Sequence, residues 1–291
     1  MNPPTDPRMS ETPRRGSLVS GPRRRWNPPA FLTATVGVHV AAVAAVVIDR
    51  NSWPWALGAV VANHGLLTGA GLWPRSKLLG PNWTSLPREV AARGEVAVTI
   101  DDGPDPEVTP RVLDLLDAHR ARATFFCIGE LVERHPALAK EIVRRGHCVE
   151  NHSHRHLNHF SVLGPRGMRQ EIVRAQEAIA AVTGELPRFF RAPAGLRNPF
   201  LDQVLNRLDL RLASWTRRGF DTLNRQAHVV LDTLTRGARG GDILLLHDGH
   251  AGHTPSGGVL ILEVLPQLLA NLASAGLTPV TLRSTLASAD S

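Results

Sequence analysis

The sequence VAVTIDDGP, residues 96–104, decides the fold class of this 291-residue chain. A short uncharged run rich in β-branched residues is typical of a buried strand, and the Asp-Asp-Gly-Pro that ends it is typical of a turn into a helix. Six further apolar runs predict strands, at 123–129, 147–151, 188–193, 212–216, 242–247 and 278–282. Stretches with helical spacing separate them, and examples cover 106–120, 131–146, 168–184 and 260–276.

Strands that alternate with helices imply a parallel α/β architecture. Three predicted helices end at a glycine that can adopt the left-handed cap: Gly146, Gly184 and Gly276. An open doubly wound sheet and a closed or nearly closed barrel both fit this alternation. In either fold the active site forms at the carboxyl ends of the strands. The polar residues that follow each predicted strand are therefore the candidate site.

Two of these strand ends carry residues that suit a metal. Asp101 and Asp102 follow the first strand, and neighbouring carboxylates point in different directions, so one can bind a metal while the other accepts a proton. His152 and His156 follow the third strand, and one helical turn would place both rings on one side. Two imidazoles and one carboxylate leave open positions for water and substrate, as in catalytic zinc sites. A capped Asp-Gly-Pro turn and a solvated histidine-rich loop are the alternatives.

The later strands end in charged residues as well. Arg191 follows an apolar strand and needs a carboxylate partner there. Trp215 lies in the fifth predicted strand, and Asp221 follows it by a few residues. His247 ends the sixth strand, and beside a metal site it is better interpreted as an acid or base than as a structural histidine.

These five strand ends, in this order, resemble the polysaccharide deacetylase family with the NodB homology domain (carbohydrate esterase family 4). The segments that carry the resemblance are 99–104 for T-F-D-D-G-P, 152–156 for H-[ST]-x-x-H, 191–195 for R-x-P-x-G, Asp221 for the second Asp of D-x-x-D-W, and 244–247 for L-x-x-H. The resemblance spans roughly residues 96–282. It implies a distorted (β/α)7 barrel rather than an open sheet.

The resemblance also implies roles for individual residues. The divalent metal, with Zn²⁺ expected, would be bound by Asp102, His152 and His156. Asp101 would be the general base and Arg191 would orient it. The remaining roles would fall to His247 as general acid, Asp221 as its orienting partner, the backbone N–H of Ala194 as oxyanion donor, and Pro193, Leu246 and Trp215 as walls of the substrate pocket. The reaction would remove an N-acetyl or related N-acyl group from an amino sugar of a glycan, glycolipid or lipid-linked sugar.

The chain departs from the family pattern where a sugar ring would bind. Ala194 stands where an aromatic residue is usual, Thr222 replaces the Trp of the fourth motif, and Arg218 replaces its first Asp. The chain contains no tyrosine. We therefore expect a reduced aromatic platform, which weakens the case for a long polysaccharide. His250 and His253 add two histidines on a glycine-rich segment, which we interpret as solvated.

The first 94 residues predict a membrane attachment ahead of the deacetylase domain at 95–291. Residues 1–29 are rich in Pro and Arg and are predicted to be a disordered basic tail. Uncharged runs at 30–48 and 53–73 predict a two-helix transmembrane hairpin over 30–75, followed by a linker at 76–94. A cleaved signal peptide and a buried helix pair are the alternatives. The arginines before the hairpin and the basic residues after it favour the cytoplasmic face of a bacterial inner membrane for the catalytic domain.

The composition excludes other classes of protein. The formal net charge is +7, and residues 1–30 contribute +4 of it, from six arginines against Asp6 and Glu11. No recognition motif accompanies this tail, so we expect no nucleic-acid partner. Two distant cysteines give neither a disulfide framework nor a Cys-type zinc site. The expected partners are an acetylated amino sugar and the membrane, and no feature indicates an oligomeric state. A catalytically inactive, membrane-anchored carbohydrate-binding protein and a hydrolase of non-sugar amides are the competing functions.

Overall fold

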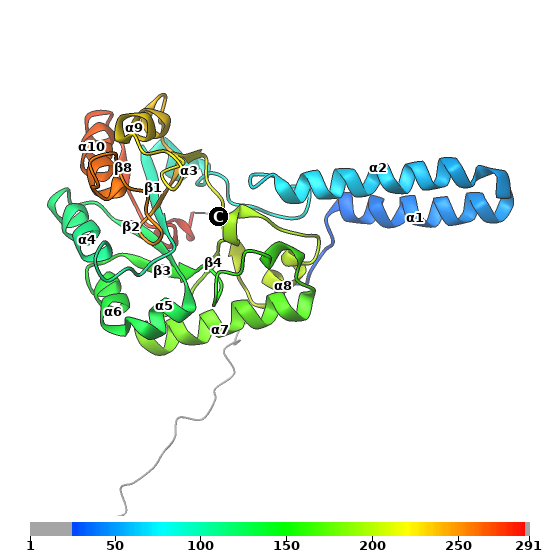
Figure 1. The fold of residues 1–291 in the computed structure, drawn as a ribbon, viewed down its shortest axis with the longest axis horizontal. Coiled ribbons are helices and arrows are strands. Elements are labelled where there is room, and N and C mark those ends of the chain that lie inside the picture. Colours follow the sequence, from blue (N-terminus) through cyan, green and yellow to red (C-terminus); the bar gives the residue numbers. More distant parts are fainter. Residues whose placement is uncertain (1–24, 289–291) are drawn as a thin grey trace, which may run out of the picture.

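The computed structural model describes residues 25–288, so most of the tail predicted at 1–29 lies outside the described residues. Its centre is a sheet of parallel strands in the order β5-β4-β3-β2-β1-β7-β6, with β8 on β1 (Figure 1). The strands are β1 Glu95–Asp101, β2 Ala123–Cys127, β3 Cys148–Asn151, β4 Phe189–Phe190, β5 Arg211–Leu212, β6 Arg217–Arg218, β7 Ile243–His247 and β8 Thr278–Pro279. Each predicted strand coincides with or borders one of these elements.

The sheet closes through one short segment. Strands β5 and β6 are the two ends of the strand order, yet only residues 213–216 separate them in the chain. The backbone N–H of Ser214 donates to the carbonyl of Trp83, and that of Thr216 donates to the carbonyl of Ile243, both at 2.9 Å. The single strand predicted at 212–216 is thus divided between the two edges. The distorted barrel implied by the family resemblance is confirmed, and the open sheet is excluded.

Helices cover the outside of the barrel (Figure 1). They are α4 Thr109–Ala118, α5 Gly129–Arg134, α6 Pro136–Arg144, α7 Pro165–Thr183, α8 Leu201–Arg207, α9 Ala227–Thr235 and α10 Leu260–Ser274. The helix predicted at 131–146 is interrupted at Pro136, whose ring and missing N–H prevent the helix from continuing through it. The glycines at 146, 184 and 276 have φ angles of 83°, 76° and 69°, so the predicted left-handed caps are confirmed.

The strands separate two layers of apolar side chains, because alternate residues point to opposite faces. Val98, Ile100 and Leu246 belong to the layer between the sheet and its helices. Ala97 and Leu245 belong to the layer inside the barrel. This alternation decides which residues of a strand can reach the site at its carboxyl end.

Residues 76–94, which we expected to be a linker, are folded onto the barrel. They contain the short helix α3 Arg88–Ala92, and Leu86 and Val90 are buried in the inner layer with Phe126. The N–H of Leu86 donates to the carbonyl of Gly241 at 2.8 Å, next to the start of β7. The segment therefore belongs to the catalytic domain, and its apolar residues fill space at the amino ends of the strands.

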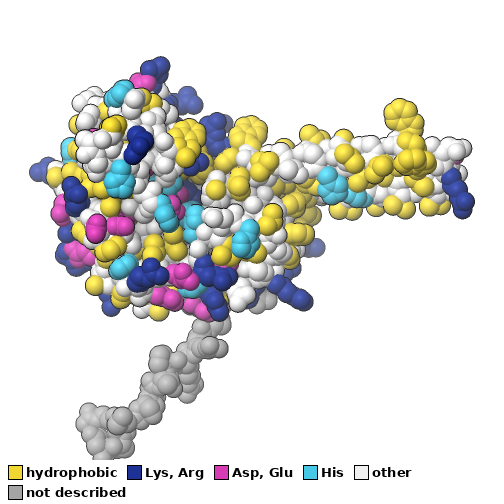
Figure 2. All heavy atoms as spheres, in the orientation of Figure 1, with side chains coloured by type: hydrophobic (Ala, Val, Ile, Leu, Met, Phe, Trp, Pro, Cys, Tyr) yellow, Lys and Arg dark blue, Asp and Glu magenta, His cyan; other side chains and the backbone are white. Residues whose placement is uncertain are grey.

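The helices α1 Ala30–Ile48 and α2 Trp53–Leu72 form a hairpin that projects away from the barrel (Figure 1). Thr35 and Asn63 are joined by a hydrogen bond of 3.3 Å, and the ring nitrogens of His39 and His64 lie 3.2 Å apart. Large apolar side chains lie exposed along both helices (Figure 2), including Val47 at 77% and Trp55 at 84%. Among the described residues, α1 alone has the length and hydropathy of a membrane span.

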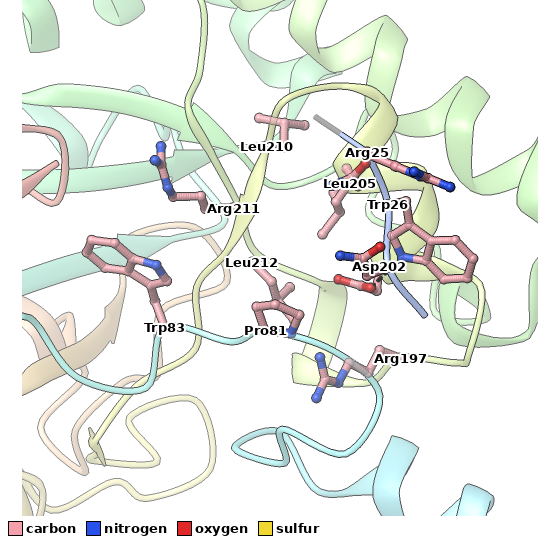
Figure 3. Close-up of a pocket in the computed structure, with 12 residues that line it drawn as sticks. Arg25, Trp26, Pro81, Trp83, Arg197, Asp202, Leu205, Leu210, Arg211 and Leu212 are labelled. Atoms are coloured by element: carbon pink, nitrogen blue, oxygen red, sulfur yellow. Dashed lines mark hydrogen bonds between the residues drawn. The ribbon is translucent and has the colours of Figure 1, made fainter. Parts of the chain in front are cut away.

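The base of the hairpin is fixed to the barrel. The carbonyl of Pro74 accepts a hydrogen bond from the Ser214 hydroxyl at 2.6 Å, and that of Gly71 accepts one from the Arg197 N–H at 3.1 Å. On the other side, Trp26 Nε1 donates to Asp202 of α8 at 2.8 Å. Figure 3 shows the residues that precede α1 lying along a cavity of about 360 Å³ beside this helix. The last residues of the predicted tail are therefore in contact with the catalytic domain.

Candidate active site

A cavity of about 300 Å³ opens at the carboxyl ends of the strands. It is lined by Asp101, Asp102, His152, His156, Asn158, Ala192, Ala194, Gly195, Trp215, Arg218, Thr222, Leu245, His247 and His250. Residues from β1, β6 and β7 and from the segments after β3, β4 and β5 thus meet at one place. This is the location that a parallel barrel predicts for its active site.

The two histidines reach the cavity by a left-handed turn rather than the helical turn we predicted. Ser153 and His156 have φ angles of 65° and 49°. The Ser153 hydroxyl accepts a hydrogen bond from the His156 N–H at 3.1 Å, and the Asn151 side chain accepts one from the Ser153 N–H at 2.9 Å. The resulting turn brings the rings of His152 and His156 to a centroid separation of 4.9 Å. The prediction that both rings lie on the same side is confirmed, whereas the prediction that a helical turn brings them there is wrong.

The three residues predicted to bind metal lie together. Asp102 Oδ1 is 3.2 Å from Nε2 of His152 and 3.3 Å from Nε2 of His156. Ligands about 2.0–2.1 Å from a tetrahedral zinc lie about 3.3 Å from one another, so these separations fit a zinc site. Oδ1 of Asp102 is also buried and without a hydrogen-bond partner among the described residues. A buried carboxylate oxygen without a donor is costly unless a cation binds it, so the donor set fits a metal.

The surroundings of the three residues affect their protonation in different ways. Nδ1 of His152 lies 2.9 Å from the carbonyl oxygen of Arg191. Because a carbonyl only accepts, Nδ1 carries the hydrogen in this bond, which leaves Nε2 as the nitrogen for a metal. Burial lowers the pKa of His152, but the charges of Asp101 and Asp102 outweigh it, so the net shift is upward. Burial and the neighbouring charge of His152 lower the pKa of His156, which favours its neutral form. Burial raises the pKa of Asp102, but the neighbouring His152, His250 and His247 outweigh it and hold that pKa well below its usual range.

Asp101 is the carboxylate partner that Arg191 was predicted to need. Nη1 of Arg191 donates to Oδ1 of Asp101 at 2.6 Å and to the Thr99 hydroxyl at 2.9 Å. Its other nitrogens donate to the carbonyls of Ala213 and Ser214, and its guanidinium lies 4.1 Å from the centre of the Phe126 ring. Arg191 is therefore buried with a partner for each nitrogen, and it holds one oxygen of Asp101 while the other faces His152 at 3.8 Å.

His247 and Asp221 form a second buried pair. Oδ1 of Asp221 lies 2.9 Å from Nδ1 of His247, and its Oδ2 accepts from the backbone N–H of the same residue at 2.7 Å. Burial lowers the pKa of His247, but the hydrogen bond and charge of Asp221 and the charges of Asp101 and Asp102 outweigh it, so the net shift is upward. Because Nδ1 of His247 is hydrogen-bonded to Asp221, Nε2 is the ring nitrogen that can interact with a molecule in the cavity. Asp101 and His247 are also direct neighbours on β1 and β7.

Ala194 lies at the rim in a left-handed conformation. Its φ angle is 54°, inside the short turn Pro193–Gly195. Gly195 follows with φ 74°, and a Cβ there would lie 2.6 Å from Trp215 and 2.8 Å from Pro74. Only glycine fits this position, since the conformation and the space both exclude a side chain. The turn thereby brings the backbone of Ala194 to the cavity.

Two of the predicted pocket residues do not line the cavity. Leu246 is fully buried in the layer between sheet and helices, because it alternates with the inward-facing His247. Leu245, two residues before His247, lines the cavity in its place. Pro193 is buried beneath the rim and also does not line it. Trp215 lines the cavity, and Arg191 and Asp221 lie behind its wall, where they contact Asp101 and His247.

Sequence reasoning assigned no site role to several lining residues. Strand alternation counted back from His247 would have selected Leu245. Arg218 and Thr222 were noted only as departures from the family pattern, and Asn158 follows the histidine turn without a motif. The side chain of His250 is 73% exposed, yet its Nδ1 lies 3.7 Å from Oδ2 of Asp102, so it belongs to the rim of the site.

Comparisons with known proteins agree with this geometry. The family model described as polysaccharide deacetylase matches residues 89–213. A peptidoglycan-N-acetylglucosamine deacetylase of Bacillus cereus is 36% identical over 175 residues, which cover 60% of this chain and 81% of that protein. A chitooligosaccharide deacetylase of Azorhizobium caulinodans is 34% identical over 158 residues, which cover 54% of this chain and 75% of that protein.

The similarity extends to solved structures. The crystal structure of the Bc1960 peptidoglycan N-acetylglucosamine deacetylase superposes with a TM-score of 0.63 and 28% identity, covering 70% of this chain and 92% of the other. Barrel, site and relatives define a hydrolase of carbon–nitrogen bonds other than peptide bonds. The chain belongs to the polysaccharide deacetylase family, and its activity is that of an amino-sugar deacetylase.

Proposed function

We propose that this chain is a membrane-attached, metal-dependent hydrolase that removes an N-acetyl or related N-acyl group from an amino sugar of a glycan, glycolipid or lipid-linked sugar. One observation carries the proposal. The buried Oδ1 of Asp102 has no hydrogen-bond donor among the described residues and faces two imidazole nitrogens, while the adjacent Asp101 is paired with Arg191. A metal site and a separate base are what amide hydrolysis on this fold requires.

Asp102, His152 and His156 would hold the metal, and their two nitrogens and one oxygen favour Zn²⁺. When bound, the metal would polarise the amide carbonyl and lower the pKa of a water molecule. Asp101 must stay off the metal, and its hydrogen bond to Arg191 keeps one of its oxygens occupied. Two of its relatives are a peptidoglycan-N-acetylglucosamine deacetylase and a chitooligosaccharide deacetylase, which supports the same chemistry here.

The chain's own residues move the protons. The free oxygen of Asp101 takes a proton from the attacking water, while Arg191 holds the other oxygen in place. The backbone N–H of Ala194 donates to the oxyanion that forms on the amide carbon. His247 then donates its Nε2 proton to the leaving nitrogen as the C–N bond breaks, and Asp221 favours the charged form that can donate. The products are acetate and a free amine.

The hairpin supplies the membrane attachment. A chain segment with this much exposed apolar surface is unfavourable in water and favourable in a bilayer. Arg25, Arg75 and Lys77 lie at its base, whereas Asp49 and Arg50 balance each other at its tip. Basic residues favour the cytoplasmic side, so we place the base and the catalytic domain on the cytoplasmic face of a bacterial inner membrane. A reporter fused after residue 291 tests this placement, and a signal on the external face would contradict it.

Acetate release tests the activity. The purified full chain, loaded with Zn²⁺, is expected to release acetate from N-acetylated chitooligosaccharides, and Asp101→Asn is expected to abolish release. Asp232→Asn, an exposed carboxylate on α9, is the matched control and should retain it. Binding of the oligosaccharide without acetate release by the unmodified chain would instead support a carbohydrate-binding protein. Release of acetate only from non-sugar amides would support the third function.

A further inference from the structure

Arg218 differs from the other charged residues of the cavity. Its side chain lines the cavity from β6, on the inner face of the barrel beside Leu245. Within residues 25–288 its guanidinium makes no hydrogen bond and no ion pair, and its Nε is buried without a partner. The two cavity carboxylates are compensated elsewhere, since Asp101 pairs with Arg191 and Asp102 lies between two histidines.

Arg217, the neighbouring residue on the same strand, has the hydrogen-bond partners that Arg218 lacks in the described chain. Arg217 points to the outer face, where its Nε donates to Asp242 at 2.6 Å and its Nη1 donates to the carbonyl of Arg236 at 2.7 Å. The fold thus provides full partners for one arginine of the pair and none for the other. Among the residues that the structure describes, Arg218 therefore lacks both a hydrogen-bond acceptor and a counterion, and an anion would supply both, because a guanidinium is always charged and only donates.

Aromatic rings hold Arg218 in position. Its guanidinium carbon lies 5.4 Å from the centre of the Trp215 ring and 5.1 Å from that of Phe220. Contacts of this kind fix the plane of the guanidinium while leaving its N–H groups free to donate. Phe220 is itself unusual, because it is half-exposed and has a φ angle of 56°, which is uncommon for a bulky residue. Strained positions of this kind concentrate at ligand sites.

We propose that Arg218 determines substrate specificity by binding an anionic group, a carboxylate or a phosphate, carried by the amino sugar close to its N-acyl group. This inference rests on the proposed function and narrows its substrate class from neutral glycans to acidic ones. The guanidinium would bind the anion through two parallel hydrogen bonds, as arginine does with both groups. The family pattern has an aspartate at this position, so the charge offered to the substrate is reversed in this chain.

Binding measurements test the proposal independently of catalysis. The probes are the methyl glycoside of N-acetylglucosamine, its 3-O-lactyl ether as the carboxylate, and N-acetylglucosamine 1-phosphate. Calorimetric titration of the full chain is expected to show tighter binding of at least one acidic probe than of the neutral one. The ratio of the two Kd values should fall about 10- to 100-fold in Arg218→Met, which corresponds to loss of one charge-assisted contact. Arg218→Lys should restore part of the preference for the acidic probe, because lysine keeps the positive charge.

The control is Arg217→Met, which removes the same charge from the outer face and should leave the ratio unchanged. The probe that loses affinity in Arg218→Met identifies the anion as carboxylate or phosphate. Equal binding of acidic and neutral probes, or a ratio that Arg218→Met does not move, would overturn the proposal. Rates of acetate release from the same probes separate the anion site from the deacetylase activity. Tighter binding of an acidic probe without acetate release would support Arg218 as an anion site and reject the proposed function. Acetate release without tighter binding of the acidic probes would support the proposed function and reject the anion site.

Discussion

The two walls of the catalytic cavity differ in how completely the chain satisfies their polar groups. On the wall formed by the ends of β1 and β3, Asp101, Asp102, His152 and His156 lie within 4 Å of one another or of Arg191. On the wall formed by β6, Arg218 lies between aromatic rings without a hydrogen bond among the described residues. The first wall is thus built for chemistry common to a family, while the second is completed by whichever substrate binds.

The largest effect is expected on the first wall. Chelation of the metal should reduce acetate release by about 10³-fold or more, with recovery when Zn²⁺ is added. Zn²⁺ should also raise the Tm of the chain, because it binds only the folded state. His156→Ala should abolish this rise in Tm, whereas Asp101→Asn should retain it while losing activity. A loss of the Zn²⁺ effect in Asp101→Asn would show that Asp101 is a metal ligand and not a separate base.

The second prediction compares how much Arg191 and Arg218 contribute to the free energy of unfolding. Arg191→Met leaves the buried Asp101 without its partner, so it should lower the free energy of unfolding by about 3–5 kcal/mol. Arg218→Met removes a cation that has no protein partner in the described chain, so the change should stay within about 1 kcal/mol. Urea denaturation of the two variants measures both values. Similar losses in both would mean that Arg218 is a structural residue.

A third prediction concerns the pH dependence set by His247. Asp221 raises the pKa of His247, so the protonated acid persists to higher pH and kcat should fall only as pH rises through this raised pKa. Asp221→Asn removes the raising charge, so the falling limb should move to lower pH, with kcat reduced about 10²-fold. The pH–rate profiles of the two proteins check this. An unchanged limb would assign the acid to another residue.

The smallest effect is expected from the neighbouring leucines of β7. Leu245→Ala should enlarge the space for the acyl group and raise the rate on an N-propionyl sugar relative to the N-acetyl sugar by about 10-fold. Leu246 lies in the layer between the sheet and its helices. Leu246→Ala should therefore lower the free energy of unfolding by about 2–5 kcal/mol without changing the ratio of the rates on the N-propionyl and N-acetyl sugars. Competition between the two substrates measures the ratio in each variant. A change in Leu246→Ala instead would restore our original assignment of the acyl wall.

That Asp101, Asp102, His152, His156 and His247 meet in one cavity could be predicted, because each strand end carries a short motif and parallel strands end at the same edge. The left-handed turn at 152–156 could not, because helical and left-handed turns both bring residues four apart to one side, and hydrogen bonds from Asn151 and Ser153 decide between them. The closure of the barrel by 213–216 depends on two-residue strands whose partners are distant in the chain. Residues 76–94 contain too few apolar positions to show periodicity, although Leu86 and Val90 are buried.

The base of the hairpin contacts the rim of the cavity at Pro74. Pro74, directly after α2, accepts a hydrogen bond from Ser214 and lies where any side chain at Gly195 would collide with it. The hairpin is therefore in direct contact with the rim that carries Ala194 and Trp215. In a chain held in a bilayer by this hairpin, the height of the cavity above the lipid surface is fixed by the fold. Membrane-bound sugars at that height would then meet the enzyme by diffusion in two dimensions, at a high effective concentration, while sugars farther out would stay beyond its reach.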